Sequence, residues 1–63
     1  MKREALLRQL RVEGRYLKRE RKRHSLWCNP QTGAIEAGPR HMEIAERLAK
    51  KICRGLGIIE VAG

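Results

Sequence analysis

The sequence is poor in cysteine and in long apolar runs, and each shortage excludes a class of protein. Its two cysteines, Cys28 and Cys53, form neither a C-x-x-C pair nor the dense framework of a small secreted domain. We therefore expect reduced thiols and a cytoplasmic protein. No apolar run approaches the roughly 20 residues that span a bilayer. The N-terminus also lacks the apolar core of a signal peptide, so we expect no membrane contact.

Acidic residues are scarce as well, because seven Asp and Glu stand against 15 Lys and Arg, which gives a net charge of +8. The imbalance is concentrated in residues 1–24, where ten cations and three carboxylates give +7. Residues 25–63 hold five cations and four carboxylates, or +1. A basic half beside a nearly neutral half is typical of proteins that bind a polyanion, most often nucleic acid.

The chain is also short. Residues 1–63 predict a single small domain, and such a domain buries a smaller share of its surface than larger ones do. Folded alone it would be marginally stable. We therefore expect a homodimer or a tightly bound partner.

Two segments have the periodicity of amphipathic helices. Residues 2–13 place leucines at helical spacing among good helix formers, and Gly14 can end the helix in a left-handed conformation. Residues 43–56 carry the stronger pattern, since apolar residues recur every three to four positions. Acids precede bases along this segment, as the helix dipole favours. Both apolar stripes predict a shared core.

A hairpin is predicted between the two helices. Residues 24–29 are bounded by charges and by Asn-Pro, which favours a strand. N-P-Q-T-G at 29–33 is the clearest turn signal in the chain. Residues 34–37 would form a short return strand, which Gly38 and Pro39 would then break. A small sheet with both helices on one face is the simplest arrangement that buries both stripes.

Two features of the middle of the chain are less determined. Residues 15–23 fit a continued helix or a solvated charged segment equally well. In residues 24–29, alternation places His24 on the same face as Leu26 and Cys28, and we expect that face to be buried. Trp27 falls on the opposite face.

The stretch before and at His24 is the best candidate for a functional site. Arg21, Lys22 and Arg23 run directly into His24. A histidine can exchange a proton near neutral pH, and a cluster of cations attracts phosphate. Cleavage of RNA by its own 2′-hydroxyl needs a base, an acid and cations that oppose the developing charge. We predict His24 as general acid or base and the three cations as phosphate ligands; the alternative is a solvated turn and a surface histidine.

Other residues extend this hypothesis. Trp27 could stack on an unpaired base, fill a protein interface or simply pack. Arg40, a further predicted phosphate ligand, and His41 precede the second predicted helix. His41 could transfer the second proton, hold a phosphate at the helix N-terminus or merely stabilise the loop. The two histidines and the two cysteines match no common zinc spacing, so we expect no metal and no cofactor.

Four pieces of the sequence, in register, resemble a known family. They are the basic, leucine-bearing first helix ending at Gly14, H-S-L-W-C-N-P at 24–30, P-R-H-M-E-I at 39–44 and A-K-K-I-C-R-G-L-G-I at 49–58. Together they cover nearly the whole chain, and their order and spacing are similar to those of the HicA toxins, small mRNA interferases of bacterial toxin–antitoxin systems. The turn before His24 carries Arg and Lys where the family usually has glycine, and Gly38 stands where it usually has a β-branched residue.

The resemblance implies an α+β fold similar to the double-stranded-RNA-binding domain, α-β-β-β-α. In that fold a three-stranded antiparallel sheet carries both helices on one face, and residues 15–20 become the first strand. The resemblance also implies an mRNA interferase, a metal-independent endoribonuclease with its catalytic histidine at His24, which a HicB-type antitoxin neutralises in a hetero-oligomer. Two alternatives stay open: a non-catalytic RNA-binding module of the same fold, and a basic subunit that docks an acidic protein.

Overall fold

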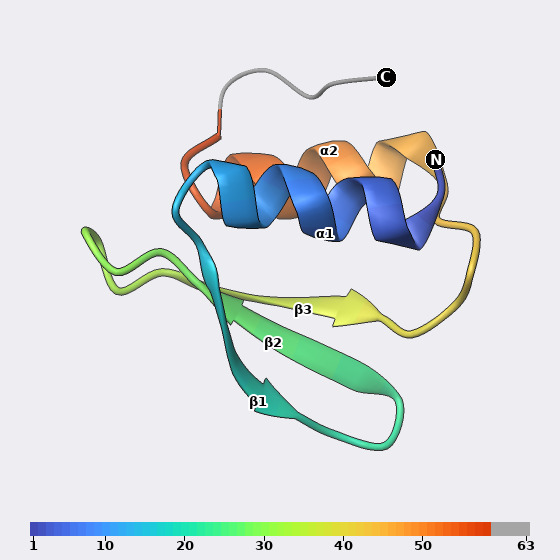
Figure 1. Cartoon of the computed structure of the whole chain (residues 1–63), viewed down its shortest axis with the longest axis horizontal. Helices are drawn as coiled ribbons and strands as arrows, with labels where there is room; N and C mark the ends of the chain where they lie inside the picture. The colour runs from blue at the N-terminus through green and yellow to red at the C-terminus, as the bar shows by residue number, and fades with distance from the viewer. Residues whose placement is uncertain (59–63) are drawn as a thin grey trace.

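A computed structural model describes residues 1–58. The elements follow one another as α1 (Arg3–Val12), β1 (Tyr16–Glu20), β2 (His24–Cys28), β3 (Ile35–Pro39) and α2 (Glu46–Gly55). The strands form one antiparallel sheet in the order β1-β2-β3. Both helices lie on the same side of this sheet (Figure 1). The predicted α+β class and the order α-β-β-β-α are confirmed, and the ambiguous residues 15–20 contain the first strand.

Helix α1 forms within the predicted segment and ends where the sequence indicated. Leu6 and Leu10 lie on its buried side. Gly14 adopts a φ of 83°, in the left-handed region that glycine tolerates, and its N–H donates to the carbonyl of Arg11 at 3.0 Å. The chain can therefore turn sharply into β1.

Helix α2 begins at Glu46, three residues later than predicted. The residues before it form a short antiparallel bridge with the start of the chain. The N–H of Arg3 donates to the carbonyl of Met42 at 2.9 Å, and the N–H of Ile44 donates to the carbonyl of Met1 at 2.8 Å. This long-range pairing holds residues 42–44 in an extended bridge, so the helix begins after them. Among the described residues, no helix is long and apolar enough to cross a membrane.

The register of the sheet determines which side chains share a face, because residues paired directly across antiparallel strands point to the same side. The face away from the helices, here called the open face, carries alternate residues of β2 and their partners on β3: His24, Leu26, Cys28, Pro39, Ala37 and Ile35. The face toward the helices carries Ser25 and Trp27, which are only 1% and 2% exposed. The prediction that the face of Leu26 and Cys28 is the one covered by the core is therefore wrong.

Trp27 provides the sheet's large apolar contribution to the core. Its ring packs in a cluster whose other members come from the two helices and from the segments before and after α2: Leu6, Leu10, Ile44, Ala49, Ile52, Cys53, Leu56 and Ile58. The Arg11 guanidinium lies over the ring, 5.6 Å from its centroid. The sequence could not choose the buried face because S-L-W-C places apolar side chains on both sides of the strand.

Strand β3 continues through Gly38 and Pro39, which were predicted to break it. Pro39 occupies the last position of an edge strand, where a missing N–H removes no essential ladder bond. Gly38 is buried beneath α2, and a Cβ added there would lie 3.7 Å from the Cδ1 atom of Ile52. The predicted turn before β3 is present, since the Gly33 N–H donates to the carbonyl of Asn29 at 2.8 Å.

Candidate functional site

His24 is the first residue of β2, and its side chain is exposed on the open face. Its carbonyl accepts a 2.8 Å hydrogen bond from the N–H of Arg21, which closes the turn between β1 and β2. Pro39 lies directly opposite on β3. The expected conflict between a catalytic role and a buried face does not arise, because the helices cover the other side of the sheet.

The three predicted phosphate ligands, Arg21, Lys22 and Arg23, are all exposed in the turn that leads into His24. Arg19 adds a fourth cation to the same region, since it pairs with Leu26 and so points to the open face. A β-bulge lies between Leu17 and Arg19, and such bulges increase local twist. The fold therefore gathers a set here called the basic hairpin: Arg19, Arg21, Lys22, Arg23 and His24.

Four side chains on the helix-covered side fix the base of this hairpin, and we call them the hairpin anchor: Arg3, Glu20, Ser25 and Arg40. The buried Ser25 Oγ accepts a hydrogen bond from Arg3 Nη2 at 3.0 Å and donates one to Glu20 Oε1 at 2.6 Å. The same carboxylate oxygen lies 3.2 Å from Arg40 Nε. The network thus ties β1 and β2 to α1 and to the segment after β3.

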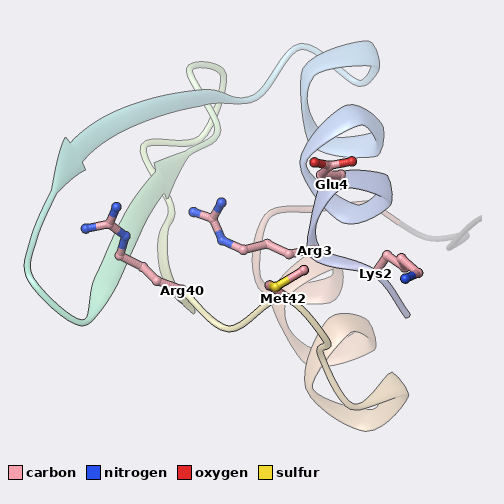
Figure 2. A pocket seen from close by; sticks show the side chains of 5 residues that line it. All are labelled: Lys2, Arg3, Glu4, Arg40 and Met42. Carbon is pink, nitrogen blue, oxygen red and sulfur yellow. The ribbon is translucent and has the colours of Figure 1, made fainter.

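The two arginines of the anchor also hold the backbone. Arg3 Nε donates to the carbonyl of Pro39 at 3.3 Å, and Arg40 Nη1 donates to the carbonyl of Arg21 at 3.3 Å. Figure 2 shows both side chains extending toward the strands, Arg3 from α1 and Arg40 from the residues after β3. Arg40 was predicted as a phosphate ligand, yet two of its nitrogens already bind the hairpin. It is better described as a residue that positions the turn.

A pocket of about 250 Å³ opens beside the hairpin anchor (Figure 2). Its lining comes from the start of α1 and from the segment after β3: Lys2, Arg3, Glu4, Arg40 and Met42. Three cations against one carboxylate make it weakly attractive to anions. Because Arg3 and Arg40 already donate to internal acceptors, the pocket offers an anion fewer donors than its charge suggests.

The position of His41 relative to α2 differs from the prediction. The residue is exposed, but α2 begins only at Glu46, so His41 does not stand at the helix N-terminus. The proposed phosphate site at that terminus is therefore wrong. His41 follows two residues after Pro39, the strand partner of His24, so topology brings both histidines to the same end of the sheet.

Trp27 is not available to a base, because its ring is 2% exposed within the core. Of the three alternatives for Trp27, packing is confirmed, while stacking on RNA and a role in an exposed protein interface are contradicted by its burial. The exposed aromatic residue of the open face is Tyr16, 46% exposed and paired with Cys28. A hydrogen bond with the Cys28 side chain raises the pKa of the Tyr16 phenol. Tyr16 was overlooked because its strand was ambiguous in the sequence.

Cys28 and Cys53 are free and buried. Cys53 is 0% exposed within α2, and this burial raises the pKa of its thiol, with the Glu13 carboxylate adding to the effect. Within residues 1–58 no three His, Cys, Asp or Glu side chains come together as a metal site would need.

The sequence could not have revealed the hairpin anchor. Arg3 and Ser25 are 22 positions apart, and Arg3 and Pro39 are 36 apart. Arg40 was singled out only as a phosphate ligand, and the Ser25 hydroxyl gave no signal by itself. Comparisons of the chain with protein-family models, with curated proteins and with solved structures find no match.

Proposed function

We propose that this protein is an mRNA interferase similar to the HicA toxins, an endoribonuclease in which His24 moves protons and the basic hairpin binds phosphate. The observation that carries the proposal is the position of His24. Its side chain is exposed on the open face, and the three residues before it in the sequence are exposed cations. Both helices lie on the other side of the sheet (Figure 1), so a polymer as large as RNA can reach His24.

The proposed reaction is internal transesterification of RNA. The 2′-hydroxyl loses its proton to a base and its oxygen forms a bond with phosphorus, while the bond to the 5′-oxygen breaks and that oxygen takes up a proton. The products carry a 2′,3′-cyclic phosphate and a 5′-hydroxyl end. An imidazole can serve as base or acid, which contributes typically about 10²–10⁴-fold. Arg21 and its neighbours would oppose the charge that develops on the phosphate oxygens.

The open face gives the substrate a second support. Tyr16 pairs with Cys28, four residues along β2 from His24, which corresponds to about 13 Å of strand. An RNA strand that runs along β2 would place one nucleotide at His24 and a base further along the strand near the Tyr16 ring. Stacking on an exposed aromatic ring tolerates any base.

The proposed state in the cell is a complex with a HicB-type antitoxin. An antitoxin of acidic character would complement the excess of cations over carboxylates in the chain. The open face also exposes Tyr16 and Ile35 beside the half-buried Leu26, an apolar surface that a protein partner could cover.

A cleavage assay tests the catalytic assignment. Labelled RNA is incubated with the parent protein and with His24→Gln in the presence of a chelator, and the new ends are identified chemically. We expect cyclic-phosphate and 5′-hydroxyl ends from the parent, and a rate at least about 100-fold lower for His24→Gln. A substrate with a single 2′-deoxynucleotide at the cut site should stay intact.

His41→Gln tests the second exposed histidine, which the sequence suggested as the other proton-transfer group. A rate within a few-fold of the parent would remove His41 from the proposed reaction, and a loss as large as that of His24→Gln would add it. Equal cleavage by the parent and His24→Gln would remove the assignment of His24. Salt-dependent RNA binding by the parent without any cleavage would instead favour the non-catalytic RNA-binding module.

A further inference from the structure

The outer side of α2 carries a stripe of cations that the proposed catalytic site does not use. The stripe is formed by four residues spaced three and four apart, and together they line a shallow groove: Arg47, Lys50, Lys51 and Arg54. At 3.6 residues per turn, this spacing places them on one side of the helix. The buried residues Ala49, Ile52 and Cys53 lie on the other side. Apart from Glu46 in its first turn, the charged residues that α2 presents to solvent are all basic.

Most of these charges lack an internal partner. Lys51 pairs with Glu36 of β3 at 3.5 Å. Among the described residues, Arg47, Lys50 and Arg54 form no ion pair within 4 Å, and all three are exposed. Four like charges on one helical side repel one another, which disfavours the helix unless an anion offsets them. The unpaired cations therefore favour the binding of a polyanionic ligand.

The composition of the stripe distinguishes between classes of polyanion. A protein interface usually has an apolar or aromatic centre and is depleted in lysine, whereas this groove is lined by cations alone. A helix that binds a membrane surface inserts an apolar side into the lipid. The apolar side of α2 is already buried in the core. A phosphate backbone needs neither feature, because it is bound by Lys and Arg irrespective of sequence.

We infer that the outer side of α2 is a second binding surface for the RNA phosphate backbone, separate from the basic hairpin. From Arg47 to Arg54 the stripe rises about 10 Å, enough to meet several successive phosphates. His24 lies on the open face, beyond the sheet from α2. One RNA molecule can reach both surfaces only by passing around an edge of the protein. The inference rests on RNA as the ligand of the proposed function, but it does not require catalysis at His24.

The test measures RNA binding in a protein that is expected not to cleave. In the His24→Gln background, affinity for a short single-stranded RNA of mixed sequence is measured between about 50 and 200 mM salt. The stripe variant is Lys50→Gln with Arg54→Gln, which leaves the Lys51–Glu36 pair intact. We expect the slope of log affinity against log salt to fall in magnitude by about 1.4, because each lost phosphate contact contributes about 0.7 for a single strand.

The matched control removes the same charge elsewhere, with Lys2→Gln just before α1 and Arg8→Gln on α1. It should change the slope by less than half as much. An equal change in both variants would show that net charge alone governs binding, and it would overturn the inference. So would an absence of RNA binding, whatever the parent does to RNA in the cleavage assay.

Amide chemical shifts give a second readout that does not depend on any variant. Titration of the His24→Gln protein with the same RNA should move the amide signals of residues 47–54. Titration with an acidic polypeptide of equal charge serves as the comparison. If α2 responds to the polypeptide and not to RNA, the surface is a protein-binding site and the inference is wrong.

Discussion

Ser25 is the residue on which the candidate site most depends, although it takes no part in the proposed chemistry. Its hydroxyl joins Arg3 to Glu20 and thereby links α1 to the hairpin that carries His24. The side chain is 1% exposed, so water cannot easily replace either hydrogen bond. A larger apolar side chain at this buried position in β2 could form neither hydrogen bond.

Ser25→Ala is predicted to lower the free energy of unfolding by about 1–2 kcal/mol, because both partners of the hydroxyl lose a hydrogen bond. The lower part of the usual range is expected, since the Glu20 side chain is 44% exposed and can be hydrated. Urea denaturation followed by circular dichroism measures the change. Thr32→Ala is the control, because it deletes a hydroxyl that accepts one exposed hydrogen bond at a turn; its effect should stay below about 0.5 kcal/mol. A Ser25→Ala value as small as the control would contradict the role of the network.

At the scale of elements, the end of α2 is the point where distant parts of the chain meet. The carbonyl of Leu56 accepts hydrogen bonds from Arg15 Nε at 2.8 Å and from Asn29 Nδ2 at 2.9 Å. Carbonyls at the end of a helix have no intrahelical donor, so the two side chains supply the hydrogen bonds that the Leu56 carbonyl would otherwise lack. The same contacts hold the segment before β1 and the hairpin turn against the helix. Gly57 follows with a φ of 78° and lets the chain turn back into the core.

Gly57→Ala is predicted to destabilise the protein by about 2 kcal/mol, because a side chain in the left-handed region is strained and crowding is added here. An added Cβ would lie 3.1 Å from Asn29 Nδ2 and 3.2 Å from Arg15 Nη2. Gly14→Ala is the matched control at the end of the other helix, with a φ of 83° and open space around the Cβ position. It should cost about 1 kcal/mol. If thermal or urea unfolding gave equal losses of stability for Gly57→Ala and Gly14→Ala, the crowding around Gly57 would add nothing to the free-energy cost.

At the scale of the whole molecule, positive charge is distributed over two separate surfaces of a very small protein. The basic hairpin and the α2 stripe lie on different sides of the sheet, and the protein carries a net charge of +8. Within residues 1–58, the carboxylates that form ion pairs with other segments are Glu20, Glu36 and Glu43. Repulsion between the unpaired cations therefore opposes the compact state.

Added salt is predicted to raise stability and to weaken RNA binding in the same protein. Screening shortens the reach of charge repulsion to about 10 Å at 0.1 M ionic strength, which favours the folded state. The urea midpoint should therefore rise between low salt and about 0.3 M sodium chloride, while RNA affinity falls because the release of counterions into more concentrated salt is less favourable. A midpoint that falls with salt would mean that the ion pairs of Glu20 and Glu36 outweigh the repulsion.

Much of the fold could be predicted from local patterns. The helical periodicity of residues 2–13 and 43–56, the glycine at 14 and the turn at 29–33 all correspond to observed elements. The errors have identifiable causes. The start of α2 moved because residues 42–44 pair with the first residues of the chain. Residues 15–20 could not be assigned from local sequence, because β1 is exposed throughout and carries no pattern of burial.

The candidate site was only partly predictable. His24 and the cations at 21–23 were recognised because they are consecutive, so their proximity does not depend on the fold. The role of Arg40 in positioning the turn and the contribution of Ser25 depend on side-chain contacts between separate elements. The burial of Trp27 and the exposure of Tyr16 could not be predicted, because the strand pattern alone gives two faces without saying which one the helices cover.

The sequence by itself determined which segments form helices, where the chain turns and that positive charge is concentrated near His24, because these properties arise from neighbouring residues. Only the tertiary structure decided which face of the sheet is covered. That choice follows from the packing of both apolar helix stripes around Trp27, a long-range contact that no local pattern contains. It buries Trp27 and leaves His24 accessible on the other side.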